Sequence, residues 1–300
     1  MKYFLLGFFT LFSWVTFAQY TSEINSNRPS KSMGAYSVSE GIFQIESGLG
    51  YQKDDYNSEL FTNIYTVDLQ LRYGVLNENL ELIADFTHEQ LHAESYGTKN
   101  TDAHFKKMTF GAKYLIFDSY KNYEEKINPW SWKANQRYKW RRLVPSVALY
   151  AAADFKSKLI KHPEMPDVSL KAGIFMQQQI SDHFSFVTNL IVENAESDDF
   201  RNFGYIATLS YGFNQKWSVF IENQGFFRKY KEVNMDFDKD DFITRTGLTY
   251  LAHNNLQFDF SAGTTFGNQP VRFIAQVGAS WRNHKVFRKK VTDDELLSEY

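Results

Sequence analysis

Acidic and basic residues that alternate with apolar ones are the residues of this sequence that could do chemistry. Asp68 and Arg72, for example, alternate with Val67, Leu69 and Leu71. Charges repeated on one side of a segment can form ion pairs or line a polar passage. They lack the spacing that a catalytic nucleophile or a zinc site requires. The chain contains no cysteine, which excludes disulfides, Cys-based zinc sites and a thiolate nucleophile.

His88 and a run of acids are two further candidates for chemistry. A barrel hydrolase would pair His88 with a serine and an asparagine, and the sequence identifies neither partner. Met235–Asp241 alternates acids in a pattern that can hold Ca²⁺, but it lacks the glycine and the distal glutamate of an EF-hand loop. We interpret this run as a solvated loop and His88 as a residue at a loop rim. We therefore predict no catalytic residue, no cofactor and no metal site.

The composition excludes several classes of protein. The 300 residues carry a formal net charge of -2, so the chain has no positive field for nucleic acid. Aromatic residues make up 17% of the chain, yet the mean hydropathy is -0.45. Such a chain is neither a bundle of membrane helices nor a disordered polymer. A single all-β domain is common at this length.

Residues 1–18 have the pattern of a cleaved signal peptide. Lys2 precedes an apolar run from Tyr3 to Phe17, and Thr16 and Ala18 are the small residues of a cleavage site. The run is shorter than the ~20 residues of a membrane-spanning helix. We predict an exported protein that starts at Gln19. It can still be a membrane protein, because a β-barrel needs no long apolar run.

From residue 41 onward, apolar and polar residues alternate with the period of a β-strand. In Gly41–Lys53, for example, Phe43 and Ile45 alternate with Gln44 and Glu46. We predict twelve strands, mostly near the ~9–11 residues that cross a membrane at a tilt. They lie around residues 41–53, 61–73, 80–87, 108–116, 147–154, 168–176, 184–192, 203–213, 217–222, 242–250, 256–266 and 271–282.

The predicted fold is all-β, a transmembrane antiparallel up-and-down β-barrel over residues 41–283. Short connections such as Gly74–Asn79 alternate with longer, charged ones, among which we count Asp54–Leu60 and Leu91–Ala103. A soluble β-sandwich or lipocalin-like barrel shows the same alternation, but long strands with aromatic residues at their ends favour the membrane barrel. The tryptophans assigned to the membrane interface are Trp130, Trp132, Trp140, Trp217 and Trp281.

The polar face of the strands is predicted to line the lumen. Opposite charges there either pair across a narrow barrel and help to close it, or form a polar conduit. Both interpretations stay open. The candidates for lumen and permeation residues are Arg28, Glu46, Asp68, Arg72, Glu81, Asp85, Lys113, Lys171, Glu193, Glu222, Arg245, Asp259, Arg272 and Arg282.

Three segments lie outside the predicted strands. Residues 19–40 are expected to be periplasmic, either as an extended lead-in or as a plug that folds into the barrel and carries Arg28. Residues 118–142 form a long periplasmic turn, in which Asn128-Pro129 can begin a short helix from Trp130 to Trp140; an irregular turn is the alternative. Residues 284–300 form a periplasmic tail, either disordered or in contact with a partner.

Several stretches resemble a family of Gram-negative outer-membrane barrels that is named after the MetA pathway of phenol degradation. The stretches are Asn27–Ser30, Ser39–Gly48, Leu71–Leu82 and the segment from Gly247 to Arg282. The resemblance covers about residues 24–283. Asn27 stands where the family usually has an aspartate, and residues 284–300 extend beyond the usual end. The resemblance implies uptake of small molecules, with apolar or aromatic ones among them.

We therefore expect a channel or uptake barrel in the outer membrane of a Gram-negative bacterium. Its partners would be outer-membrane lipid, lipopolysaccharide and an unidentified small-molecule substrate. The alternative is a non-conducting accessory barrel that docks to an outer-membrane or periplasmic protein through the 118–142 turn and the C-terminal tail. A barrel enzyme is a third and weaker hypothesis.

Overall fold

The computed structural model describes a barrel and the segment that precedes it. The described residues are 24–57, 60–95, 98–121, 129–131, 133, 140–156, 167–228, 241–266 and 270–283. The predicted signal peptide, the C-terminal tail and the acidic run before Asp241 lie outside them. So does most of the predicted helix from Trp130 to Trp140, where the structure describes one 3-10 turn, η1 (Trp140–Leu143).

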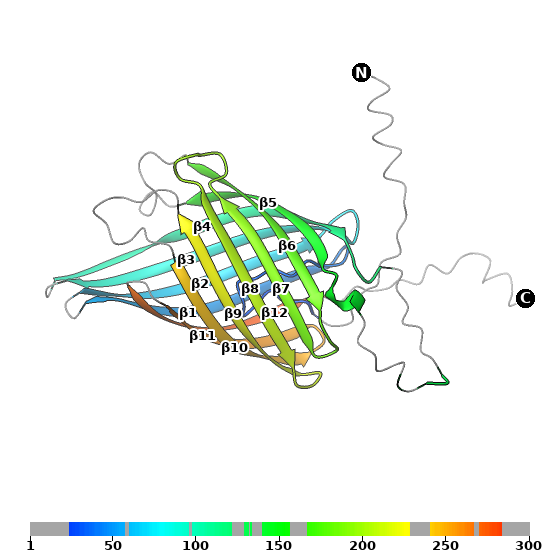
Figure 1. Ribbon diagram of the computed structural model, residues 1–300. Coiled ribbons are helices and arrows are strands. Elements are labelled where there is room, and N and C mark those ends of the chain that lie inside the picture. Colours follow the sequence, from blue (N-terminus) through cyan, green and yellow to red (C-terminus); the bar gives the residue numbers. More distant parts are fainter. Residues whose placement is uncertain are drawn as a thin grey trace, which may run out of the picture.

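Twelve antiparallel strands close into one barrel, as the alternation predicted (Figure 1). Each strand pairs with its neighbours in the chain, and β1 pairs with β12. The strands are β1 (Phe43–Asn57), β2 (Leu60–Gly74), β3 (Leu80–Ser95), β4 (Thr98–Phe117), β5 (Ser146–Lys156), β6 (Val168–Gln179), β7 (Phe184–Glu193), β8 (Asn202–Gly212), β9 (Trp217–Arg228), β10 (Asp241–His253), β11 (Leu256–Thr265) and β12 (Val271–Arg282).

The two faces of each strand have opposite chemistry. Leu149, Leu190 and Phe260 are 46–50% exposed on the outside. Glu46 and Arg72, on the inside, are 1% and 0% exposed. An outward apolar face with a polar interior is the arrangement of a barrel in a membrane, where each backbone group is paired within the closed sheet. Among the described residues, no helix is long and apolar enough to cross a bilayer.

The first four strands are longer than predicted. Asp54 and Asp55 remain paired with both neighbours of β1, and the β3–β4 ladder runs without a loop through Leu91–Ser95 and Thr98–Ala103. The prediction of loops over 54–60 and 91–103 was therefore wrong for the residues of these ranges that the structure describes. Strand pairing uses backbone groups and tolerates polar side chains on both faces. The β1–β2 and β3–β4 hairpins extend together beyond the other strands (Figure 1).

Residues 24–42 run inside the barrel before β1 begins. The N–H of Ile24 donates to the carbonyl of Asn254, in the short β10–β11 turn, and Glu40 forms a bridge with Gly74 at the end of β2. Both points lie at the end that carries the short turns, which is the periplasmic end in barrels of this class. The segment therefore enters and leaves the lumen at the same end. We call residues 24–42 the N-terminal segment.

An apolar cluster inside the lumen packs against this segment. Ala35 lies among Ile83, Leu115, Tyr150 and Phe175, all 8% exposed or less. The rings of Tyr150 and Phe175 stack with centroids 5.1 Å apart. Removing this apolar surface from water stabilises the segment in the lumen.

Candidate functional site in the barrel lumen

The site is built around a row of ion pairs on β1–β4. Arg72 lies between two carboxylates: its Nη1 is 2.8 Å from Glu46 Oε1, and its Nε is 2.6 Å from Glu81 Oε1. Lys113 Nζ is 3.3 Å from Glu81 Oε2. All four side chains are fully buried. Glu81 and Lys113 are directly opposite in the ladder, and Glu46 and Glu81 each stand two residues from the position opposite Arg72. All four therefore share one face of the sheet as diagonal or direct neighbours.

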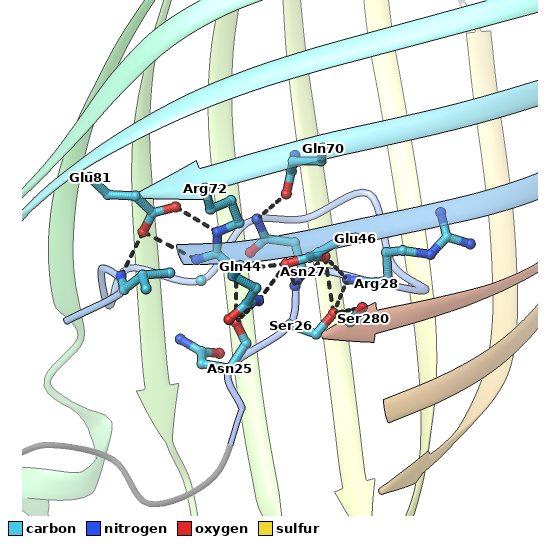
Figure 2. A network of polar contacts seen from close by, with 12 residues as sticks. Asn25, Ser26, Asn27, Arg28, Gln44, Glu46, Gln70, Arg72, Glu81 and Ser280 are labelled. Atoms are coloured by element: carbon cyan, nitrogen blue, oxygen red, sulfur yellow. Dashed lines mark hydrogen bonds and ion pairs between the residues drawn. The ribbon is translucent and has the colours of Figure 1, made fainter. Parts of the chain in front are cut away.

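Glu46 also binds the backbone of the N-terminal segment. It accepts hydrogen bonds from the N–H groups of Asn27 and Arg28 at 3.1–3.2 Å and from the hydroxyl of Ser26 at 3.0 Å. Figure 2 shows the segment lying against Glu46 and Arg72 of the wall. Three donors of the segment thus converge on one buried carboxylate and replace hydration that it has lost.

Glu222 on β9 repeats this arrangement on the opposite wall. It accepts from the N–H groups of Lys31 and Ser32 at 2.9 and 3.2 Å. Thr208 and Gln224 donate to the same carboxylate. The side chain is fully buried, so these donors replace the water that the charge has lost.

Amide side chains hold the next turn of the segment. Asn189 on β7 accepts from the N–H of Met33 at 2.6 Å and donates to the carbonyl of Met33 at 2.8 Å. Gln177 on β6 accepts from the N–H of Ala35 at 3.1 Å. A side-chain amide has both donors and acceptors, so Asn189 can pair with a peptide unit as another strand would.

Arg28 occupies a slot made by two glycines and an acid. Its guanidinium makes two hydrogen bonds to the Asp259 carboxylate, at 3.1 and 3.2 Å, and one to the carbonyl of Val277. A Cβ atom on Gly48 or Gly278 would lie 2.2–2.3 Å from Arg28 Nη2. The two glycines face each other across the β1–β12 ladder. Only residues without side chains leave room for the guanidinium here.

The remaining lumen charges also have opposite charges or amides nearby. Lys171 Nζ lies 2.7 Å from Glu193 and 3.5 Å from Asp154, Arg272 lies 3.4 Å from Asp54, and Lys31 lies 3.4 Å from Asp68. Gln70 donates to Asp85, and Arg245 donates to Gln276. Arg282 is 4% exposed.

The structure places the predicted lumen residues on or against the inner face. It brings Glu46, Arg72, Glu81 and Lys113 into one network and joins Arg28 to Asp259. Sequence reasoning missed the neutral residues Asn189 and Gln177, although both stand at polar positions of their alternating strands. Their positions in the alternating pattern predict that they face inward, but the predicted candidates included only charged residues.

A polar cavity lies beside the segment. Its volume is ≈ 160 Å³, and hydroxyl and amide groups dominate its wall, among them Ser32, Gln177, Thr208 and Thr249. A larger hollow, of ≈ 840 Å³, lies over β4–β9 and is lined by apolar residues, with Ala112, Ala151 and Ala172 side by side in the ladder. These alanines belong to the outer face, so the larger hollow faces lipid and is separate from the lumen site.

Two of the tryptophans assigned to the membrane interface, Trp217 and Trp281, lie at or next to the ends of their strands. Trp217 and Trp281 are 40% and 42% exposed, and Trp217 lies 4.5 Å from Tyr250 between ring centroids. Trp130 and Trp140 are 94% and 77% exposed, and Trp132 lies outside the described residues. Interfacial positions for these side chains remain a prediction. His88 lies within β3 rather than at a loop rim. The centroids of its ring and of the Phe105 ring are 5.2 Å apart.

The described residues hold no group of three or more histidine or acidic side chains arranged for a metal ion. The predicted acidic run at Met235–Asp241 is not among the side chains that the structure describes.

The closed barrel, its apolar outer face and its polar interior define an outer-membrane β-barrel of the Gram-negative type. More narrowly, the chain belongs to the family described as "Putative MetA-pathway of phenol degradation", whose model matches residues 26–282. The resemblance found in the sequence is thereby confirmed.

Solved structures share the fold at low sequence identity. The COG4313 outer membrane channel from Pseudomonas putida F1 is 11% identical with a TM-score of 0.53; the match covers 87% of this chain and 100% of that one. The NanC porin is 9% identical with a TM-score of 0.51, over 79% of this chain and 98% of that one. No curated protein matches the sequence.

Proposed function

We propose that this protein is an outer-membrane channel for the uptake of small molecules. The observation that carries the proposal is a closed barrel whose polar interior holds a segment that is not a strand of the sheet. Backbone hydrogen bonds hold the two ends of the segment, Ile24 to Asn254 and Gly41–Ile42 to Gly74. Between these ends, the contacts with the wall are made by side chains. Contacts of this kind can break while the wall stays intact.

The neighbours and the family support transport. Two solved barrels of the same fold are a porin and an outer membrane channel. The family description refers to phenol degradation. A hydroxylated aromatic molecule would match both kinds of surface that line the lumen: the apolar cluster at Tyr150 and Phe175 and the hydroxyl and amide groups beside it.

Conductance in planar bilayers tests the proposal. The chain from Gln19, the predicted mature N-terminus, is compared with its Arg28→Ala variant, which removes the hydrogen bonds of the guanidinium to Asp259 and Val277 and changes no residue of the wall. We expect rare, small openings for the unmodified chain and an open probability at least several times higher for the variant. Absence of conductance in both proteins would contradict a channel.

A non-conducting accessory barrel is the second candidate, and the filled lumen favours it. Its proposed docking regions, residues 118–142 and 284–300, lie largely outside the described part of the chain. A silent Arg28→Ala barrel that copurifies with an envelope protein through these regions would support this role. We propose no enzymatic activity.

A further inference from the structure

The lumen recognises the backbone of the N-terminal segment more than its side chains. Seven N–H groups between residues 27 and 38 donate to side chains of the wall, and five carbonyl groups between residues 25 and 36 accept from them. The donors are the N–H groups of Asn27, Arg28, Lys31, Ser32, Met33, Ala35 and Val38. The acceptors are the carbonyls of Asn25, Arg28, Met33, Gly34 and Tyr36.

The wall groups that make these contacts come from all sides of the barrel. Glu46, Glu81 and Glu222 supply carboxylates, whereas Asn189 and Gln177 supply amides. Lys113 donates to two carbonyls of the segment, at 2.9 Å each. Peptides in general have the N–H and C=O groups that these side chains bind, so this part of the recognition does not depend on the sequence of the occupant. The positions of Gly34 and Ala35 require small residues, since a Cβ atom on Gly34 would lie 2.7 Å from Gln177 Oε1 and Ala35 is fully buried.

The wall also binds side chains of Ser26, Asn27, Lys31 and Tyr36, and the position of Arg28 is the most selective, because a built slot holds its guanidinium. The slot formed by Gly48, Gly278 and Asp259 has the depth and the paired acceptors for a guanidinium. Arginine fits such a slot better than lysine, because its planar fork makes two parallel hydrogen bonds to one carboxylate.

We infer that the lumen is a binding site for extended peptides with an arginine, and that the N-terminal segment is its resident occupant. A peptide supplied from outside takes the same contacts when the segment leaves. The inference names a ligand class for the proposed channel. Passage of such peptides through the membrane rests on the proposed channel function, whereas their binding in the lumen does not.

The covalent link favours the resident segment over a free peptide in competition for the lumen site. A tethered segment acts at an effective concentration in the millimolar range, so a free peptide competes poorly with it in the unmodified protein. Arg28→Ala lowers that advantage and empties the guanidinium slot. This variant therefore exposes the site while keeping the full chain and the wall unchanged.

The test measures binding of a fluorescent peptide with the sequence of residues 25–38 to detergent-solubilised protein by polarisation. We expect binding to the R28A chain at least tenfold tighter than to the unmodified chain. A peptide with alanine in place of arginine should bind R28A at least tenfold more weakly. In R28A/D259N the preference for the arginine peptide should disappear. Unchanged heat-dependent gel migration shows that each variant is folded.

Two further peptides separate recognition of the backbone from recognition of side chains. N-methylation at the positions of Lys31 and Met33 keeps the side chains but removes the N–H groups that bind Glu222 and Asn189, and should weaken binding at least tenfold. A peptide that keeps the arginine and the small residues at the positions of Gly34 and Ala35, and is otherwise unrelated, should bind within tenfold of the native sequence. No binding to folded R28A, or equal binding of the N-methylated peptide, would overturn the inference. A protein that binds peptide without conducting would refute the channel alone.

Discussion

Arg72 is the residue on which the buried network of the lumen depends. It lies within 2.8 Å of Glu46 and 2.6 Å of Glu81, and all three side chains are inaccessible to water. The carboxylates have lost their hydration, so the guanidinium and the N–H groups of the N-terminal segment must replace it. Because the cluster is buried, loss of one member leaves a charge that neither a partner nor water compensates. Water compensates the remaining charge of an exposed ion pair.

Replacing Arg72 with methionine is expected to destabilise the folded barrel by about 3–5 kcal/mol, because two buried carboxylates are left without their shared cation. Urea unfolding in lipid vesicles measures the change. Lys99→Met is the matched control: Lys99 lies 3.5 Å from Glu94 and is 77% exposed. It should change stability by less than about 1 kcal/mol. Equal effects of the two substitutions would show that the lumen network does not stabilise the fold.

Gly48→Ala tests the guanidinium slot from the wall side. A methyl group at this position would lie 2.2 Å from Arg28 Nη2, so the long arginine side chain must leave. The variant should show the raised open probability expected for R28A in bilayer recordings. Gly212→Ala is the control, since a Cβ atom there has no neighbour closer than 3.9 Å. A Gly48→Ala channel that behaves as the unmodified one would mean that Arg28 does not hold the segment.

At the scale of the elements, each strand separates lipid from lumen by simple alternation. Leu190 in β7 is 46% exposed on the outer face, while its neighbour Asn189 is fully buried against the N-terminal segment. A shift of one residue in register would exchange these environments along the whole strand. A charge placed on the outer face must lie in lipid, and the free energy that this costs depends on how deep in the membrane it lies.

Leu190→Arg, well inside β7, is expected to cost about 2–4 kcal/mol, and Phe184→Arg, at the first residue of β7, about 0–1 kcal/mol. Folding into vesicles of the two variants, followed by urea titration, compares them directly. Similar costs at both positions would be inconsistent with β7 crossing the hydrocarbon layer.

At the scale of the whole molecule, the barrel and its N-terminal segment are two parts with different kinds of attachment. The wall is closed by continuous strand pairing, including β1 with β12. The segment is attached through side-chain contacts and an apolar cluster. Local opening requires the loss of few contacts compared with unfolding of the sheet, so the segment can move while the barrel persists.

A disulfide between the segment and the wall tests this separation. The hydroxyl oxygens of Ser26 and Ser280 lie 2.7 Å apart, and the chain has no native cysteine to interfere. In an Arg28→Ala background, Ser26→Cys with Ser280→Cys should abolish the raised conductance under oxidising conditions, and a reductant should restore it. Each single cysteine is the control. Persistent openings in the oxidised protein would show that ions pass without movement of the segment.

The sequence by itself determined the architecture of the wall. A strand presents alternate residues to opposite faces, so Phe43, Ile45 and Leu71 on one side and Glu46 and Arg72 on the other were enough to predict a membrane barrel with a charged lumen. The ends of the strands were harder to predict from the sequence. The pairing of Asp54, and that of Leu91 with Asp102, depends on backbone partners that a polar pattern does not reveal.

Only the tertiary structure decided what fills the lumen and which charges meet. Arg28 and Asp259 are separated by 231 positions, and Lys31 and Glu222 by 191. The sequence left open whether residues 19–40 lead into the barrel or fold inside it. Periodicity fixes which face a side chain takes, whereas contacts across a closed barrel depend on the register of every strand between them. For that reason a local pattern could assign these residues to the interior but could not pair them.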